Sequence, residues 1–128
     1  MSRFHLDTDF LVYALSSRGV EWRRLAAIVD SDAMLEISAL SWYEFCRGPR
    51  TPEQIAVARG LFGDQGIIAL TEAIAERAGE EFRRLGSPRR RAADVVIGIT
   101  AVSYGARLVT RNRTDFEDIH GLELEAVS

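Results

Sequence analysis

Four acidic residues stand where a parallel sheet would bring them together. Asp7 ends the apolar segment RFHLD, and Asp115 follows the apolar segment ARLVT. Glu44 follows the apolar segment MLEIS, and Asp94 lies just after an arginine triplet. In an open parallel sheet, active sites lie beyond the carboxyl ends of the strands. The positions of the four acids therefore predict one cluster of carboxylates.

Such a cluster has a defined chemistry. Carboxylates without lysine or histidine among them repel one another when they are dry and unpaired, and each pair about 4 Å apart costs about 4 kcal/mol at an effective dielectric constant of about 20. The cluster is stable when it binds cations or takes up protons. Oxygen ligands select Mg²⁺ or Mn²⁺, which keep several waters and accept phosphate oxygens. The predicted reaction is metal-assisted phosphodiester hydrolysis, in which the metal lowers the pKa of a bound water and stabilises the leaving oxygen.

Each acid also has a purely structural interpretation. Ser41 and Glu44 have the spacing of a capping box, and Asp94 is favoured by the dipole of the helix that it begins. Asp115 lies among loop-forming residues, where aspartate bonds its own backbone. Asp9 is placed to cap the first predicted helix. The joint position of the acids after strands favours the functional interpretation, because capping alone does not require it.

The elements that position these acids follow from hydrophobic periodicity and from helix start and stop signals. Strands are predicted over residues 3–7, 34–38, 66–70, 106–110 and 122–127. Helices are predicted over 9–16, 20–30, 52–62, 72–85 and 92–104, and in SALSWYEFCRGP before Gly48 and Pro49. This alternating order predicts an α/β fold with a mostly parallel sheet covered by helices on both faces.

Length and composition indicate one domain over residues 1–128, and they are typical of a soluble globular protein, with 47% hydrophobic and 27% charged residues. The sequence lacks an apolar run of the roughly 18–20 residues that a membrane span needs. The N-terminus has acids where a secretory signal would be apolar, so a cytoplasmic protein is expected.

The basic residues are all arginine, because the sequence has no lysine. Removing four metal-binding acids from the net charge of −3 leaves +1, so the charge does not exclude RNA or DNA as a substrate. Arg89, Arg90 and Arg91 directly precede Asp94, and guanidinium groups bind phosphate in a bidentate manner. We therefore predict that this triplet contacts substrate, with Arg111 and Arg113 as weaker candidates of the same kind.

Three segments together cover nearly the whole chain: LDTDFLVYAL, SALSWYEFCRG and AADVVIGITAVSYGARLVTRNRTDF. In their order and spacing they resemble the PIN-domain ribonucleases, and among these the VapC-type toxins of bacterial toxin–antitoxin pairs. The resemblance implies a PIN-like three-layer α/β/α sandwich, an Mg²⁺- or Mn²⁺-dependent endoribonuclease, a homodimer, and a small antitoxin whose tail covers the active-site groove. It also implies site residues. The metal-binding catalytic acids would be Asp7, Glu44, Asp94 and Asp115, with Asp9 as a helix cap and Asn112 as a polar neighbour that orients water or phosphate.

Two other functions are compatible with parts of the sequence. One is a phosphatase with Asp7 as nucleophile and Asp9 as acid, although such enzymes place a lysine beside the phosphate and this chain has none. The other is a non-catalytic PIN-like module that only binds a partner. Several further residues receive structural interpretations: Cys46 as a buried thiol, Gly98 as a close packing point, the aromatic residues Trp22, Trp42, Tyr43 and Phe45 as packing groups, and His5 and His120 as structural histidines.

Overall fold

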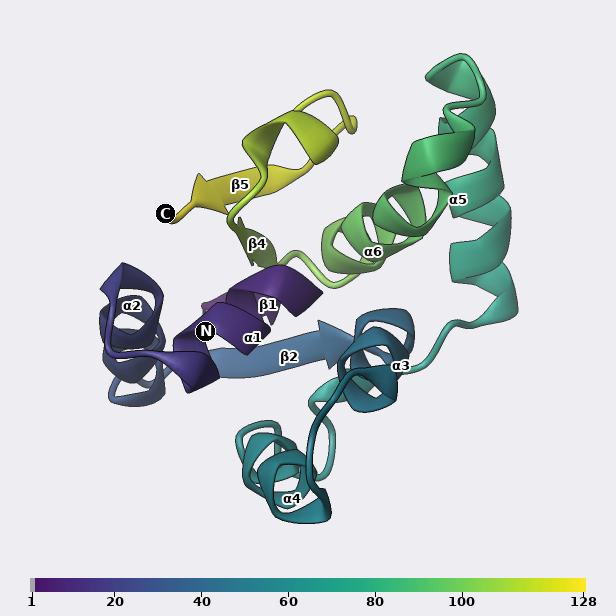
Figure 1. Cartoon of the computed structure of the whole chain (residues 1–128). Helices are drawn as coiled ribbons and strands as arrows, with labels where there is room; N and C mark the ends of the chain where they lie inside the picture. Colours follow the sequence, from purple (N-terminus) through teal and green to yellow (C-terminus); the bar gives the residue numbers. More distant parts are fainter. Residues whose placement is uncertain (1) are drawn as a thin grey trace.

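The structure, a computed structural model, describes residues 2–128 as five parallel strands and six α-helices (Figure 1). The strands are β1 (Arg3–Leu6), β2 (Met34–Ser38), β3 (Ile67–Ile68), β4 (Arg107–Thr110) and β5 (Glu123–Ala126). The helices are α1 (Thr8–Ser16), α2 (Val20–Val29), α3 (Ala39–Arg47), α4 (Pro52–Gly60), α5 (Glu72–Arg84) and α6 (Ala92–Ser103). Two short 3₁₀ helices, η1 (Arg89–Arg91) and η2 (Arg113–Asp115), precede α6 and follow β4.

The sheet has the strand order β3-β2-β1-β4-β5, and every pairing is parallel. Successive residues of a strand point to opposite faces. Val109 of β4 packs into a core with α1, α2, α3 and α4, whereas its neighbour Leu108 packs into a second core with α5 and α6. The predicted three-layer α/β/α sandwich with a parallel central sheet is therefore confirmed.

The topology places the ends of β1 and β4 side by side in the middle of the sheet. The backbone N–H of Asp7, just beyond β1, donates to the carbonyl oxygen of Val109 at 3.0 Å. Helix α3 begins directly after β2, which neighbours β1 on its other side. Residues that follow β1, β2 and β4 thus meet at one end of the sheet.

Most predicted elements are confirmed, with ends that differ by one or two residues. The exception is the strand expected over 66–70, of which only Ile67 and Ile68 pair with β2. This strand lies at the edge of the sheet, where it has one neighbour, and Leu70 is already half exposed. Beyond Ile68 the chain therefore has neither a second strand nor a core to hold it extended.

Several structural interpretations are confirmed, but Tyr43 is 56% exposed rather than packed, and Cys46 is only partly buried. A Cβ added to Gly98 would lie 2.5 Å from the Cδ1 of Ile119, so α6 does pack closely here. Trp42 stacks on Phe45 with ring centroids 5.5 Å apart. His5 is fully buried, and its Nδ1 is 2.8 Å from Glu36 Oε1. Burial raises the pKa of the partly buried Cys46 thiol. Across residues 2–128, none of the helices combines the length and the apolar character that crossing a membrane requires.

Gly66 supplies a stability test with a matched control. A Cβ at this position would lie 2.1 Å from the carbonyl oxygen of Phe62 and 2.8 Å from that of Leu35, and backbone atoms cannot yield as a flexible side chain can. We expect Gly66→Ala to lower the free energy of unfolding by at least about 2 kcal/mol. Gly79, in the interior of α5, has open space around it, so Gly79→Ala should stabilise by about 0.5–1 kcal/mol. Urea denaturation of the two variants measures both effects, and equal shifts would contradict the prediction.

Candidate active site

The four predicted acids lie around the end of the sheet at which β1, β2 and β4 finish. We call Asp7, Glu44, Asp94 and Asp115 the carboxylate rim. Asp7 follows β1, Glu44 lies on α3, Asp94 lies in the first turn of α6, and Asp115 ends η2. The pKa of Asp94 is raised by the charges of the other three. The structure therefore brings all four carboxylates into one electrostatic site.

Asp7 is the most buried acid of the rim, with 6% of its surface exposed. It caps α1, because its Oδ1 accepts from the backbone N–H of Thr8 at 2.8 Å. Its Oδ2 accepts from the Thr110 hydroxyl, also at 2.8 Å. Burial raises the pKa of Asp7 to about 6, although these two hydrogen bonds favour its charged form. The carboxylate is thus fixed in direction by one donor on each oxygen.

Glu44 is held by a different hydroxyl. Thr8 Oγ1 donates to Glu44 Oε1 at 2.8 Å, so Thr8 contacts two acids of the rim, one through its backbone and one through its side chain. The capping-box interpretation of Glu44 is wrong. Ser38 caps α3 and accepts from the backbone N–H of Ser41, which places Ser41 inside the helix rather than at its start.

Asp94 differs from Asp7 and Glu44 because no hydrogen-bond donor stabilises its charge among the described residues. Burial and then the nearby charge of Asp115 raise the pKa of Asp94 to about 7, and the guanidinium of Arg91 offsets this only in part. Its side chain does not cap α6, whose N-terminus has no side-chain cap. Asp94 lies in the first turn of α6, where the helix dipole favours an acid, but this does not offset the burial and the neighbouring charges that raise its pKa.

The prediction that Asp9 caps α1 is wrong. Asp7 occupies the cap position, with φ −79° and ψ 153°, and α1 begins at Thr8. Asp9 is exposed within the first turn, where its Oδ2 accepts from Asn112 Nδ2 at 3.3 Å. Asp9 and Asn112 are thus neighbours at the edge of the carboxylate rim, as predicted for Asn112. The role of Asn112 toward water or phosphate stays a prediction.

The arginine triplet divides into two kinds of residue. Arg89 and Arg90 are exposed on η1. Arg91 is instead held by the segment that carries Asp115: its Nε and Nη2 donate to the Asp115 carbonyl oxygen at 3.1 and 2.9 Å, and its Nη1 donates to Asp118 Oδ2 at 2.9 Å. Arg91 therefore joins the start of α6 to η2, and most of its donors are used. Substrate contact by Arg89 and Arg90 stays a prediction.

This role of Arg91 is testable. Lysine has no planar fork and cannot bond the Asp115 carbonyl and both oxygens of Asp118 at once. Arg91→Lys should therefore lower the free energy of unfolding by about 1–2 kcal/mol. The control is Arg90→Lys, on the exposed side of the same turn, which should change stability by less than about 0.5 kcal/mol. Equal denaturation midpoints for the two variants would exclude the joining role.

Thr8 and Thr110 belong to the site as well, although no sequence motif singles them out. Their signal was the hydroxyl residue beside each strand end, in LDT and LVT. Thr110 is fully buried, donates to Asp7, and accepts from the backbone N–H of Asn112 at 3.0 Å. Only the structure reveals that these hydroxyls orient Asp7 and Glu44.

The donor set of the rim fits a hard divalent cation. Within residues 2–128, no three His, Cys, Asp or Glu side chains meet closely enough to enclose an ion by themselves. Mg²⁺ does not require such a cage, since it commonly binds one or two carboxylates and keeps several waters. Asp7 and Asp94 would hold the ion, with Glu44 and Asp115 beside them.

The model of the PIN domain family matches residues 5–122. The chain belongs to the PIN domain family.

Solved structures agree on the fold of this PIN domain. A toxin–antitoxin complex from Klebsiella pneumoniae matches at 27% identity with a TM-score of 0.72, over 95% of each chain. VapBC2 from Rickettsia felis, bound to a promoter DNA fragment, matches at 20% identity with a TM-score of 0.73, over 97% of this chain and 98% of that one. DNA-bound VapBC from Salmonella typhimurium matches at 23% identity with a TM-score of 0.71, over 98% of both chains. No curated protein sequence matches the chain significantly.

Proposed function

We propose that this PIN domain is a metal-dependent endoribonuclease that serves as the toxin of a toxin–antitoxin pair. The observation that carries the proposal is the carboxylate rim, in which acids from four separate segments meet at the end of the sheet. Membership of the PIN family supports nuclease chemistry, and the similar structures from toxin–antitoxin complexes support the biological role.

The residues of the rim and those around it have different roles in this proposal. When bound, Mg²⁺ or Mn²⁺ would supply an activated water and positive charge for phosphodiester hydrolysis. Thr110 and Thr8 hold Asp7 and Glu44, so that the free lone pairs of these carboxylates keep one direction. Asp94 has no competing donor and is open to a cation. The exposed Arg89 and Arg90 offer positive charge to the phosphates of RNA.

Nothing in the site favours the alternative phosphatase. That reaction needs Asp9 to act as an acid beside Asp7, yet Asp9 is exposed and contacts Asn112. The chain also has no lysine to bind the transferred phosphate. The homodimer and the cytoplasmic location stay predictions.

The direct experiment is hydrolysis of total cellular RNA by the purified chain. We expect cleavage with Mg²⁺ or Mn²⁺, none with EDTA, and none by Asp94→Asn under either condition. Intact RNA with both metals, or equal cleavage in EDTA, would overturn the proposed reaction. A cleavage map of the same digestion identifies the RNA that is cut.

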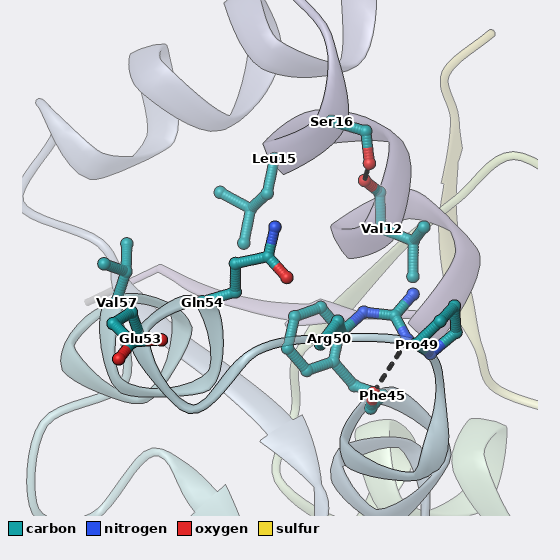
Figure 2. A pocket seen from close by; sticks show the side chains of 9 residues that line it. All are labelled: Val12, Leu15, Ser16, Phe45, Pro49, Arg50, Glu53, Gln54 and Val57. Atoms are coloured by element: carbon teal, nitrogen blue, oxygen red, sulfur yellow. Dashed lines mark hydrogen bonds between the residues drawn. The ribbon is translucent and has the colours of Figure 1, made fainter.

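The proposed antitoxin needs a binding surface, and a groove along α1 supplies one. A groove of about 630 Å³ lies between α1 and the α3–α4 segment (Figure 2). Its lining combines apolar with polar side chains: Val12, Leu15, Phe45, Pro49 and Val57 with Ser16, Arg50, Glu53 and Gln54. Arg50 lies in this groove, with its Nη1 bonded to the Phe45 carbonyl oxygen at 2.9 Å. Val12 and Leu15 line the groove five and eight residues beyond Asp7, so a segment seated there runs along the helix that begins at the carboxylate rim. An apolar antitoxin segment that carries an acidic residue for Arg50 fits this surface.

The groove is tested by a charge placed in its wall. Val57 is 66% exposed, and Val57→Glu should abolish the stable complex with the proposed antitoxin, as measured by co-purification and gel filtration. The control is Val29→Glu on α2, because Val29 is half exposed and does not line the groove. Retention of the complex by Val57→Glu would exclude the groove as its seat.

A further inference from the structure

An exposed aromatic–arginine pair lies next to the carboxylate rim. Tyr13 follows Asp9 by four residues on α1, so the two side chains lie on the same face, one turn apart. Tyr13 is 45% exposed. The guanidinium carbon of Arg111 lies 3.5 Å from the centre of this ring.

Arg111 is held flat against the ring by a second contact. Its Nε donates to Glu21 Oε2 at 3.0 Å, and Glu21 is buried in the first turn of α2. The two Nη groups of Arg111 have no hydrogen-bond partner within the described chain, and 26% of its side chain is exposed. The guanidinium is therefore fixed in orientation while its outer donors stay free.

The pair is connected to the rim through the backbone at the end of β4. Arg111 is followed by Asn112, which bonds Asp9, and preceded by Thr110, which bonds Asp7. Along α1, Tyr13 is six residues from Asp7, or about 9 Å at 1.5 Å per residue. The pair is thus near enough to contact a nucleotide that neighbours the phosphate at the acids.

We propose that Tyr13 and Arg111 form a nucleotide-binding subsite of this PIN domain, which rests on its proposed ribonuclease function. One face of the Tyr13 ring is covered by Arg111, and an unpaired base stacks on the other. The free Nη groups of Arg111 bond the phosphate that joins this nucleotide to the scissile one. Aromatic stacking and a guanidinium beside it are the two groups by which proteins bind single-stranded RNA with little sequence preference.

The chain contains a matched control pair. Tyr43 on α3 is 56% exposed and has the guanidinium carbon of Arg47 5.2 Å from its ring centre. This second pair has the same chemistry and also lies near the rim, since Tyr43 precedes Glu44, but within residues 2–128 no hydrogen bond fixes Arg47 as Glu21 fixes Arg111. A general effect of exposed tyrosines on RNA binding would therefore appear at Tyr43 as well as at Tyr13.

The experiment uses the full chain with Asp94→Asn, so that RNA is bound without being cut. The probe is a short single-stranded RNA of mixed sequence that contains 2-aminopurine, whose fluorescence is quenched by stacking. We expect Tyr13→Leu to weaken binding between about fivefold and a hundredfold and to remove part of the quenching. Tyr13→Phe should retain both, and Tyr43→Leu should have no effect. Arg111→Gln should reduce the salt dependence of binding by about one phosphate contact.

Unchanged affinity and quenching in Tyr13→Leu would overturn the subsite, as would equal loss in Tyr43→Leu. Loss of the antitoxin complex in Tyr13→Leu with normal RNA binding would also overturn it, because the surface would then serve a protein partner. These failures are distinct from failure of the proposed function. If the native chain leaves total RNA intact with Mg²⁺ and Mn²⁺, the proposed ribonuclease reaction is wrong. If the native chain cleaves RNA but Tyr13→Leu binds RNA as tightly as the Asp94→Asn parent, only the subsite is wrong.

Discussion

Asp94→Asn should abolish RNA cleavage and at the same time stabilise the metal-free protein at pH 8. The loss of activity is expected to be at least about a hundredfold, because the substitution removes an anionic ligand that has no substitute at the rim. The gain in stability follows from the same position. Ionised Asp94 is desolvated, is repelled by Asp115, Asp7 and Glu44, and accepts no hydrogen bond that would offset these costs. Asparagine has a similar shape and carries no charge.

The pH dependence gives this prediction a definite sign. The pKa of Asp94 is raised from 3.8 to about 7, so the folded protein holds a proton that the unfolded chain has already released over this interval. The unfavourable contribution of Asp94 is therefore absent below about pH 4, grows as the pH rises to 7, and is complete above it. The stability difference between Asp94→Asn and the native chain should be largest at pH 8 and should vanish at pH 4.

Thermal denaturation at the two pH values measures this difference, and Mg²⁺ supplies a second readout. The ion should raise the melting temperature of the native chain and leave that of Asp94→Asn unchanged, because a ligand stabilises only a protein that binds it. The control is Asp64→Asn, at an exposed loop position, which should alter neither quantity. A variant that is less stable than the native chain at pH 8 would show that Asp94 makes favourable contacts, contrary to this description of the site.

The fold was predictable because its signals are local. Apolar segments such as MLEIS mark buried strands, and the amphipathic pattern of residues 72–85 marks α5. Their alternating order restricts the architecture to a parallel sheet between two layers of helices. The rule that sites lie beyond the carboxyl ends of parallel strands then placed all four acids at the same end of the sheet. The predicted length of the edge strand β3 was too great. The strand pairs with β2 alone, and the sequence does not show that it has no second neighbour.

The detailed roles of the side chains depended on contacts that sequence patterns do not encode. Arg89, Arg90 and Arg91 are identical in sequence terms, yet only Arg91 contacts Asp118, 27 residues further along the chain. Ser38 and Ser41 are both able to cap α3, and the choice rests on where β2 ends. Local spacing therefore located the carboxylate rim but did not identify Thr8, Thr110 and Arg91 as the residues that hold it in place.

The clearest separation of roles concerns two aspartates that are one residue apart. Asp7→Asn should reduce RNA cleavage by at least about a hundredfold and abolish Mn²⁺ binding, because Asp7 presents its charge at the centre of the rim. The fold should survive, since asparagine also caps helices and can accept from the Thr8 backbone. Asp9→Asn should retain activity within about threefold. Asp9 is exposed, and an asparagine oxygen there can still accept from Asn112.

The two variants form a matched pair, because each replaces one carboxylate by its amide at the start of α1, Asp7 at the cap position and Asp9 in the first turn. Saturating Mn²⁺ and a single RNA substrate give the rate constants, and calorimetric titration with Mn²⁺ gives binding without any turnover. A comparable loss for both aspartates would mean that the site depends on the total negative charge at the start of α1. A loss confined to Asp7 would mean that it depends on one carboxylate, fixed in direction by Thr8 and Thr110. The second outcome is expected, because only Asp7 is both buried and bonded through each of its oxygens.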